Sequence, residues 1–442
     1  MRAGLLTFEY IRRRASYNEA RMSLDCGLFM GKTTKAVVSC IIISIAILFS
    51  TPDLAKTILP TAVALQSHSV ISINGNSGFT AANGVTSGTG TAADPYVISG
   101  WDINVFTSGT SAEYSTCIQI QNATAYFVVS GISVECHETG VFLSGVYNAR
   151  IESSTISSDS QAFQAQFSTN LTLSGNSING GTSPNGGAYS NVLLRISSAS
   201  VVGNTIRADG FEIDNSKQVM FSGNSVTASG YAAPVWVSDS SSVTISNNSM
   251  SVAYIEGGLD VSKSTNLTIL NNTIQGNISY GISLGNSNST VISENRVIGG
   301  GVNGYLTDDQ GIVLESSSKV EIFGNNVTLE AIGIHLSSST GNHLYHNNLV
   351  NNTIQAQDDQ PGQNSWDNGY PSGGNFWSDY TSVDNCSGPQ QNVCPSPDGI
   401  GDTPYTFSSA QDNYPLMTPF ATDPPATGSA GGGGGGRPPL RA

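Results

Sequence analysis

Two carboxylates and one tryptophan occupy the same position in three successive copies of a repeated segment. This combination suits the binding or the cleavage of a sugar. Glu212, Trp236 and Asp260 occupy equivalent places in three consecutive repeats, and Asp214 lies two residues after Glu212. An exposed indole ring is an apolar platform for a sugar, and two carboxylates can act as general acid and general base. We therefore take Asp214 and Trp236 as candidate ligand-binding residues, and Glu212 and Asp260 as candidate catalytic residues.

The separation of Glu212 and Asp260 decides whether they can act together. If the repeats stack as neighbouring strands, the two residues are two strand spacings apart, about 9.6 Å along the backbone. Inverting glycosidases hold their carboxylates about 6.5 to 9.5 Å apart, which leaning side chains would reach. Exposed strand positions are polar in any case, so a chance placement of these residues is the simpler alternative.

Two further groups have the composition of metal ligands. His335, His343 and His346 lie within one repeat, and clustered histidine binds copper. Their spacing places His335 and His343 on different outer faces, so we expect solvated histidines and not a copper site. Carboxylates also gather near the C-terminus, and hard oxygen ligands suit calcium. The candidate calcium ligands are Asp398 and Asp402, which Asp379 and Asp384 could join.

An internal repeat positions all of these residues. Counted from a first residue at zero, apolar residues stand at offsets 1, 3, 11 and 16, and Asn stands at offset 14. Ten such repeats begin 19 to 30 residues apart, the first four in looser form, near Cys117, Gly140, Ala162, Asn191, Gly210, Pro234, Gly258, Gly281, Gly311 and Gly333. Apolar pairs two residues apart are typical of short strands, so each repeat predicts three strands separated by turns.

Repeats that cannot bury their own apolar face must stack on one another. The sequence therefore predicts an all-β fold, a right-handed single-stranded parallel β-helix of about ten coils over residues 117–354. We expect the Asn at offset 14 to adopt left-handed geometry in a tight turn and to form an amide ladder. Two longer coils carry their extra residues after offset 16, at 179–189 and 299–309, and these loops should emerge from one edge.

The segments around the repeats predict caps and appendages. Because a β-helix leaves unpaired strand edges at both ends, we expect an N-terminal cap at 65–116 and an aromatic, Asp-rich C-terminal cap at 355–420. Trp377 should be buried in that second cap. The six consecutive glycines within 421–442 indicate a disordered tail.

Residues 1–64 have the pattern of an export leader. An apolar run of 14 residues at 36–49 follows two lysines, and Ala62-Val63-Ala64 offers a cleavage site, although an uncleaved anchor is the alternative. Export makes disulfides the expected state of the remaining cysteines. These are Cys117, Cys136, Cys386 and Cys394, of which the last pair brackets a short loop. Ten Asn-x-Ser/Thr sequons also predict a glycoprotein.

The charge balance limits the partners. Without residues 1–64 the chain keeps 9 basic and 28 acidic residues, a net charge of -19. Nucleic-acid affinity depends on Lys and Arg, so a nucleic acid or an anionic lipid surface is a poor partner. Membrane contact is expected only through an uncleaved leader.

Both flanks resemble a known family. The motif Asp-Pro-Tyr-Val-Ile-x-Gly-Trp at 94–101 is similar to the opening segment of exported, mostly archaeal β-helix proteins of the NosD-like group, within the pectin-lyase-like superfold. Gly-Asn-Phe-Trp-Ser-Asp-Tyr at 374–380, Asp-Gly-Ile-Gly-Asp-Thr-Pro-Tyr at 398–405 and Asp-Asn-Tyr-Pro-Leu at 412–416 resemble their closing segment. The resemblance implies the fold over residues 70–420. It also implies two functions, because the family is named for a protein of copper assembly while many members are described as carbohydrate-binding or sugar-hydrolysing.

A second resemblance concerns Asp308 and Asp309, which are followed one repeat later by His335. Pectin-degrading β-helix hydrolases carry a similar Asp pair and His. This sequence lacks their Asn-Thr-Asp, Gly-His-Gly and Arg-Ile-Lys elements, so we interpret the Asp pair as a turn.

The sequence thus predicts a secreted or cell-surface protein that binds extracellular glycan or serves as a surface component, without catalysis. The first alternative is a polysaccharide hydrolase that uses Glu212, Trp236 and Asp260. The second is copper delivery, as in NosD.

Overall fold

A computed structural model describes most of the chain beyond the predicted leader. The described residues are 64–106, 116–181, 191–228, 232–300, 309–360 and 362–421. Residues 1–63, most of the two long loops and residues 422–442 lie outside them, so the predictions for the leader and the tail concern residues that are not described. Among the described residues, no helix is long and apolar enough to cross a membrane.

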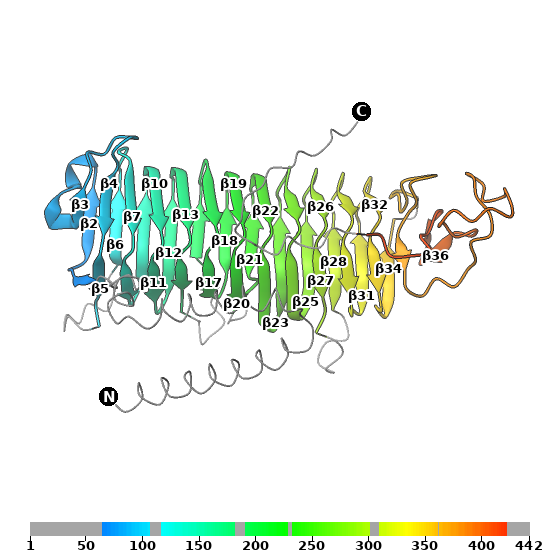
Figure 1. Ribbon diagram of the computed structural model, residues 1–442. Coiled ribbons are helices and arrows are strands. Elements are labelled where there is room, and N and C mark those ends of the chain that lie inside the picture. Colours follow the sequence, from blue (N-terminus) through cyan, green and yellow to red (C-terminus); the bar gives the residue numbers. More distant parts are fainter. Residues whose placement is uncertain are drawn as a thin grey trace, which may run out of the picture. The chain divides into compact units, whose positions relative to one another are not determined.

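The predicted repeats form the coils of a right-handed parallel β-helix, as Figure 1 shows. Each coil contributes one strand to each of three faces. The first face contains β2 (Ile71–Asn74), β6 (Thr116–Gln121), β9 (Thr139–Ser144), β12 (Gln161–Gln166), β15 (Asn191–Leu194), β18 (Phe211–Asp214), β21 (Val235–Ser238), β28 (Gln310–Glu315), β31 (Ile332–Ser337) and β34 (Ile354–Asp358).

The second face is a 12-stranded sheet. Its strands are β3 (Val85–Ser87), β4 (Tyr96–Ser99), β7 (Phe127–Ser130), β10 (Tyr147–Glu152), β13 (Thr169–Ser174), β16 (Ala199–Val202), β19 (Lys217–Ser222), β22 (Ser241–Ser246), β24 (Thr268–Leu270), β26 (Val291–Ser293), β29 (Glu321–Phe323) and β32 (His343–Tyr345).

The third face joins the first in a 23-stranded sheet, because two strands run through the corner between them. These are β23 (Ser249–Ser262) and β25 (Thr273–Gly285). The other strands of the third face are β1 (Gln66–Ser67), β5 (Trp101–Asn104), β8 (Ser133–Cys136), β11 (Thr155–Ser158), β14 (Ser177–Asn179), β17 (Thr205–Ala208), β20 (Ser225–Ala228), β27 (Arg296–Ile298), β30 (Asn326–Thr328), β33 (Asn348–Val350) and β35 (Phe376–Trp377).

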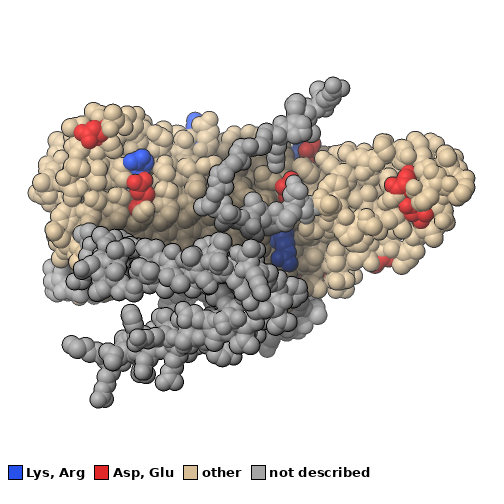
Figure 2. All heavy atoms as spheres, viewed as in Figure 1, with Lys and Arg blue, Asp and Glu red and all other residues tan. Residues whose placement is uncertain are grey.

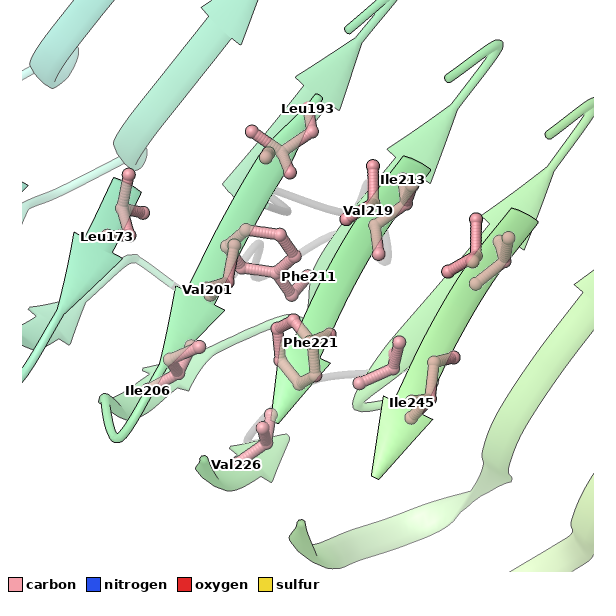
Figure 3. Close-up of a cluster of buried hydrophobic side chains, with 14 of the residues drawn as sticks. Leu173, Leu193, Val201, Ile206, Phe211, Ile213, Val219, Phe221, Val226 and Ile245 are labelled. Carbon is pink, nitrogen blue, oxygen red and sulfur yellow. The ribbon is translucent and has the colours of Figure 1, made fainter. Parts of the chain in front are cut away.

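The core follows the predicted register. Side chains at offset 1, such as Leu259, Ile282 and Ile312, lie directly opposite one another in consecutive coils and are fully buried. Figure 3 shows Phe211 of the first face and Phe221 of the second face meeting in the lumen, where their ring centroids are 5.1 Å apart. Apolar side chains from all three faces therefore fill the interior.

A buried asparagine ladder runs along one corner, as predicted. The Nδ2 group of each ladder residue donates to Oδ1 of the next at 2.9–3.1 Å, and the backbone N–H of each donates to the same oxygen. The ladder consists of Asn176, Asn204, Asn224, Asn248, Asn272, Asn295, Asn325, Asn347 and Asn375.

The left-handed geometry was predicted for the wrong residue. It belongs to the residue before each ladder asparagine from Asn176 to Asn347, for example Asn247 (φ 56) and Asn271 (φ 52), and at several coils to a glycine. The turn therefore reverses at offset 13, and the side chain at offset 14 is free to point inward along the stack.

The ladder ends at a buried carboxylate. Asp412 accepts hydrogen bonds from the backbone N–H of Asn375 at 2.7 Å, from Nε1–H of Trp377 at 2.9 Å and from the backbone N–H of Tyr414 at 3.0 Å. It is fully buried, and burial raises its pKa to about 7 against the effect of these three donors. Asp412 thus occupies the acceptor position that the next asparagine would have filled.

The ends of the stack are built differently. At the N-terminal end, β1, β2, β4 and β5 pair in parallel with the following coil, so residues 65–105 form coil as well as cap. Only β3 and the 3-10 turns η1 (Asn76–Gly78) and η2 (Ala81–Asn83) stand apart from the repeat. At the C-terminal end, the antiparallel hairpin of β36 (Tyr405–Phe407) and β37 (Ala410–Asp412) covers the lumen. Trp366 and Trp377 are buried beneath it, as expected for Trp377.

Two disulfides confirm the cysteine prediction. Cys117 is bonded to Cys136, and Cys386 is bonded to Cys394. The first joins β6 of the first face to β8 of the third face, and the second closes the predicted small ring in the C-terminal cap.

The repeat frame predicts the outcome of a coil deletion. Removing the 23 residues 258–280 should leave a folded, shorter protein, because each coil contacts only its neighbours and Asn248 would then meet Asn295 in the ladder. Removing only residues 258–268 should destroy the register and cause aggregation. Circular dichroism and a melting curve of both variants check this, and equal aggregation of the two would contradict the frame.

Candidate functional site

The predicted row of side chains lies on the outer side of the first face. Glu212 pairs with Trp236 across β18 and β21, and Trp236 pairs with Asp260 across β21 and β23. Trp236 is 43% exposed, which is high for an indole side chain. The structure therefore brings the two carboxylates to either side of an accessible indole.

The carboxylate on the N-terminal side of Trp236 has a perturbed acidity. Burial raises the pKa of Glu212, and repulsion from Asp214 raises it further. Asp214 itself accepts a hydrogen bond from Oγ of Ser238 at 2.7 Å. Asp214 is thus a fixed acceptor whose charge makes the neighbouring Glu212 a weaker acid.

The carboxylate on the other side is held by hydroxyl groups. Burial raises the pKa of Asp260, while hydrogen bonds from the side chains of Tyr280 and Ser283 and from the backbone oppose this shift. Ser283 is directly opposite Asp260 on the next strand. Asp260 is therefore oriented by its neighbours and half-buried.

Tyr280 was missed in the sequence. Strict alternation along β25 would place it in the lumen with Ile282, but the bend at the corner leaves it half-exposed. The only signal is Gly257, which is directly opposite Tyr280 on the preceding coil. A Cβ atom at Gly257 would lie 1.9 Å from the Tyr280 ring, so the glycine makes room for the ring to lie across that coil.

The Asp pair with His335 does not form a second site of this kind in the described residues. Asp308 lies outside them. Asp309 is buried and accepts a hydrogen bond from the backbone N–H of Ala331 at 3.1 Å. His335 Nδ1 forms a hydrogen bond of 2.8 Å with Oε1 of Gln310. Asp309 therefore hydrogen-bonds the backbone at a corner of the next coil, which agrees with its interpretation as a turn residue.

The three clustered histidines are separated by the fold. His335 lies on β31 of the first face and His343 on β32 of the second. Nε2–H of His343 donates to the carbonyl of Asp367 at 3.0 Å, and Nε2–H of His346 donates to the carbonyl of Ser372 at 2.8 Å. These two side chains thus tie β32 and its turn to the C-terminal cap.

The four candidate calcium ligands are satisfied by hydrogen-bond donors. Asp402 accepts from the backbone N–H of Cys386, Asp384 from that of Gly399, and Asp398 from that of Ile400. Asp379 accepts from the hydroxyl of Tyr405. Within the described ranges, no group of three or more His, Cys, Asp or Glu is arranged to hold a metal ion.

The surface around the coils carries few charges. Figure 2 shows one side on which residues other than Lys, Arg, Asp and Glu dominate, with isolated acidic and basic patches. Two ion pairs lie within the described part of the chain, between His137 and Asp159 and between Arg150 and Glu152. The outer side of the first face carries the carboxylates of Glu212, Asp214, Asp260 and Glu315, together with hydroxyl and amide groups and the apolar Phe142 and Val313.

Comparison with known proteins identifies the family. The family profile described as "Periplasmic copper-binding protein (NosD)" matches residues 64–252 and 190–382. The chain therefore belongs to the NosD family, a class of parallel β-helix proteins, as the flanking motifs predicted. No curated protein matches the chain.

Several solved structures are similar to this chain at low identity. The periplasmic alginate epimerase AlgG is 15% identical over 60% of this chain and 67% of its own, with a TM-score of 0.34. The A-module of the Azotobacter vinelandii mannuronan C-5 epimerase AlgE6 is 12% identical over 61% and 86%, with a TM-score of 0.39. The Dettilon tailspike protein is 14% identical over 63% and 59%, with a TM-score of 0.36.

The family description raises the question of copper. Copper needs clustered imidazole, thioether or thiolate ligands. In the parts of the chain that the structure describes, the four cysteines form disulfides and His343 and His346 hold backbone carbonyls. These residues do not fit a copper site.

The raised pKa of Glu212 predicts a pH-dependent effect of its replacement. Because the folded state holds this proton more tightly than the unfolded state, wild-type stability falls as pH rises above about 4.5, the ordinary pKa of Glu. Glu212→Gln removes this loss. Relative to wild type, it should gain stability from pH 4 to pH 7, by less than about 1 kcal/mol at this partly exposed site.

Denaturant melts at both pH values measure the difference. The exposed Glu294→Gln serves as the control and should show no such gain. An equal gain in both variants would mean that the effect comes from net charge and not from the surroundings of Glu212.

Proposed function

We propose that the protein is an exported β-helix protein that binds extracellular polysaccharide on its first face, without cleaving it. The observation that carries the proposal is the in-register arrangement of Glu212, Trp236 and Asp260, with an indole that is 43% exposed. Burial of a sugar's apolar side against the ring would favour binding, and the flanking carboxylates would accept hydrogen bonds from its hydroxyl groups.

The spacing of the coils supports binding of a chain. Successive outer positions of the first face repeat at about 4.8 Å, the strand spacing. Glu212, Asp260 and Ser283 present carboxylate or hydroxyl groups in the same row as Trp236. A polymer lying along the stack would thus meet the same kind of polar group several times.

The exported location is proposed from the leader and the disulfides. Disulfides persist in oxidising compartments, and two are present here. The family description also names a periplasmic protein. An exported protein of this kind would meet cell-surface or extracellular glycan.

Replacing Trp236 tests the proposal. Residues 65–421, without the predicted leader and the glycine-rich tail, are titrated against a panel of neutral and acidic polysaccharides. Trp236→Ala should weaken binding by about tenfold, equivalent to about 1.4 kcal/mol.

Tyr147→Ala is the matched control, because Tyr147 is 46% exposed on β10 of the second face. It should leave affinity unchanged. Equal losses in the two variants, or no binding to any member of the panel, would rule out the first-face site.

Hydrolysis is the second candidate function. The observation in its favour is that burial raises the pKa of both Glu212 and Asp260, since a general acid must keep its proton near neutral pH. A carboxylate that stays ionised is needed as its partner. Because both carboxyls are shifted in the same direction, binding without cleavage is the better supported function.

Release of reducing ends from the same polysaccharides decides between the two functions. Under the binding proposal, wild type releases none. Release that is lost in both Glu212→Gln and Asp260→Asn would establish the hydrolase instead.

A further inference from the structure

At the corner between β30 and β31, an apolar side chain is exposed and a charged side chain is buried. Leu329 points outward and is 47% exposed, while the next residue, Glu330, points inward and is 2% exposed. Leu329 has φ 63, a left-handed conformation that is unusual for a branched apolar residue. The backbone is thus held in a strained turn that buries a carboxyl group and exposes a leucine.

The buried carboxyl group lacks hydrogen-bond partners. Neither Oε1 nor Oε2 of Glu330 has one, although both atoms are shielded from solvent. The charged residue that acts on it is Asp309, which is 6% exposed and has the same charge. Burial, and then repulsion from Asp309, raises the pKa of Glu330 to about 8. No ion pair in the described part of the chain involves either residue.

Two buried carboxyl groups with the same charge destabilise the fold unless a partner neutralises their charge. A buried carboxylate is normally paired, hydrogen-bonded or bound to a metal. Asp412, which is equally buried, has three N–H donors. Glu330 has none in the described residues, so the missing partner must be a proton or a ligand of positive charge.

Oxygen atoms converge beside Gly299, the first residue after β27. A Cβ atom at Gly299 would lie 2.8 Å from Oε2 of Glu330 and 2.3 Å from the backbone oxygen of Leu329. Gly299 therefore packs directly against the carboxylate and this carbonyl, which lie on the same side of it, and a side chain at position 299 would displace them. Carboxylate and carbonyl oxygens together are the ligands that Ca²⁺ prefers.

We propose that Glu330 and Asp309 bind a divalent cation of the calcium type at this corner, with backbone carbonyl oxygen and water completing its shell. Gly299 and Asp309 stand at the two ends of the insertion between β27 and β28, and Glu330 belongs to the next coil. The cation clamps the base of the insertion to the following coil. This site is independent of glycan binding.

Calcium-dependent melting of the exported chain tests the site. At pH 8, saturating CaCl₂ should raise the Tm of wild type over that in EDTA by at least about 2 °C. Glu330→Gln and Asp309→Asn should each abolish the rise. Glu330→Gln should also melt higher than wild type in EDTA, because it removes the uncompensated charge. Isothermal titration should find one calcium site in wild type and none in either variant.

Asp402→Asn is the control, since Asp402 belongs to the C-terminal Asp cluster. It should keep the calcium-dependent rise, and loss of the rise in Asp402→Asn alone would overturn the proposal by placing the cation in the cap. The proposal also fails if calcium neither binds wild type nor raises its Tm, while Tm falls between pH 6 and pH 9 only when Glu330 is present. That result would assign the role of the cation to a proton. Should Glu330→Gln not fold, Asp309→Asn and the wild-type titration still decide.

Discussion

The in-register stacking of identical turns is the constraint on which the rest of this structure depends. At offset 14 the side-chain amide oxygen accepts a hydrogen bond from a backbone N–H of the previous coil. The amide nitrogen of the same side chain donates to the oxygen of the next coil, so the residue needs both an acceptor and a donor. Nine asparagines form this chain, all with at most 2% exposure. A buried polar group left without a partner costs about 1–3 kcal/mol. Any coil out of register would break several such bonds at once, so the ladder fixes the length of every turn that it passes.

Fixed inner positions leave the outer positions free to vary. Lumen residues such as Leu259 and Ile282 are constrained by their neighbours above and below. The outer residues between them contact solvent, and there the chain places hydroxyl and amide groups at most coils. Phe142 and Val313 are also apolar at the equivalent position, but Trp236 is more exposed than either, with nearly half of its surface accessible. An exposed indole in a rigid row is thus best explained by a ligand, and the stacking explains how its position is held.

The length of the repeat and the alternation of apolar and polar residues along each strand were enough to predict the coils, the ladder and the row of Glu212, Trp236 and Asp260. They could not predict Tyr280, because a strand that bends through a corner no longer alternates. The left-handed residue was assigned one position too late, since Asn occurs at both offsets 13 and 14 and only the structure shows which one turns. The unpaired edge of a β-helix predicts a cap at 65–116, and the sequence does not show that β2 and β5 of this segment also pair with the stack, because the segment lacks the ladder asparagine that marks the other coils.

The two most buried perturbed carboxyls show how context decides the role of a charge. Asp412 stands where the amide ladder ends, so donors that would have met another asparagine converge on it. Glu330 follows a strained leucine at a corner where the ladder does not pass, and its oxygens meet Asp309 in place of donors. Apolar patterning alone would have buried Leu329 and exposed Glu330. A turn that does the opposite, at a cost in both strain and desolvation, gains stability when a positive partner is supplied from outside the chain. The rigid stack therefore supplies N–H donors to the carboxylate of Asp412. It supplies none to the carboxylate of Glu330, which is left to bind a ligand.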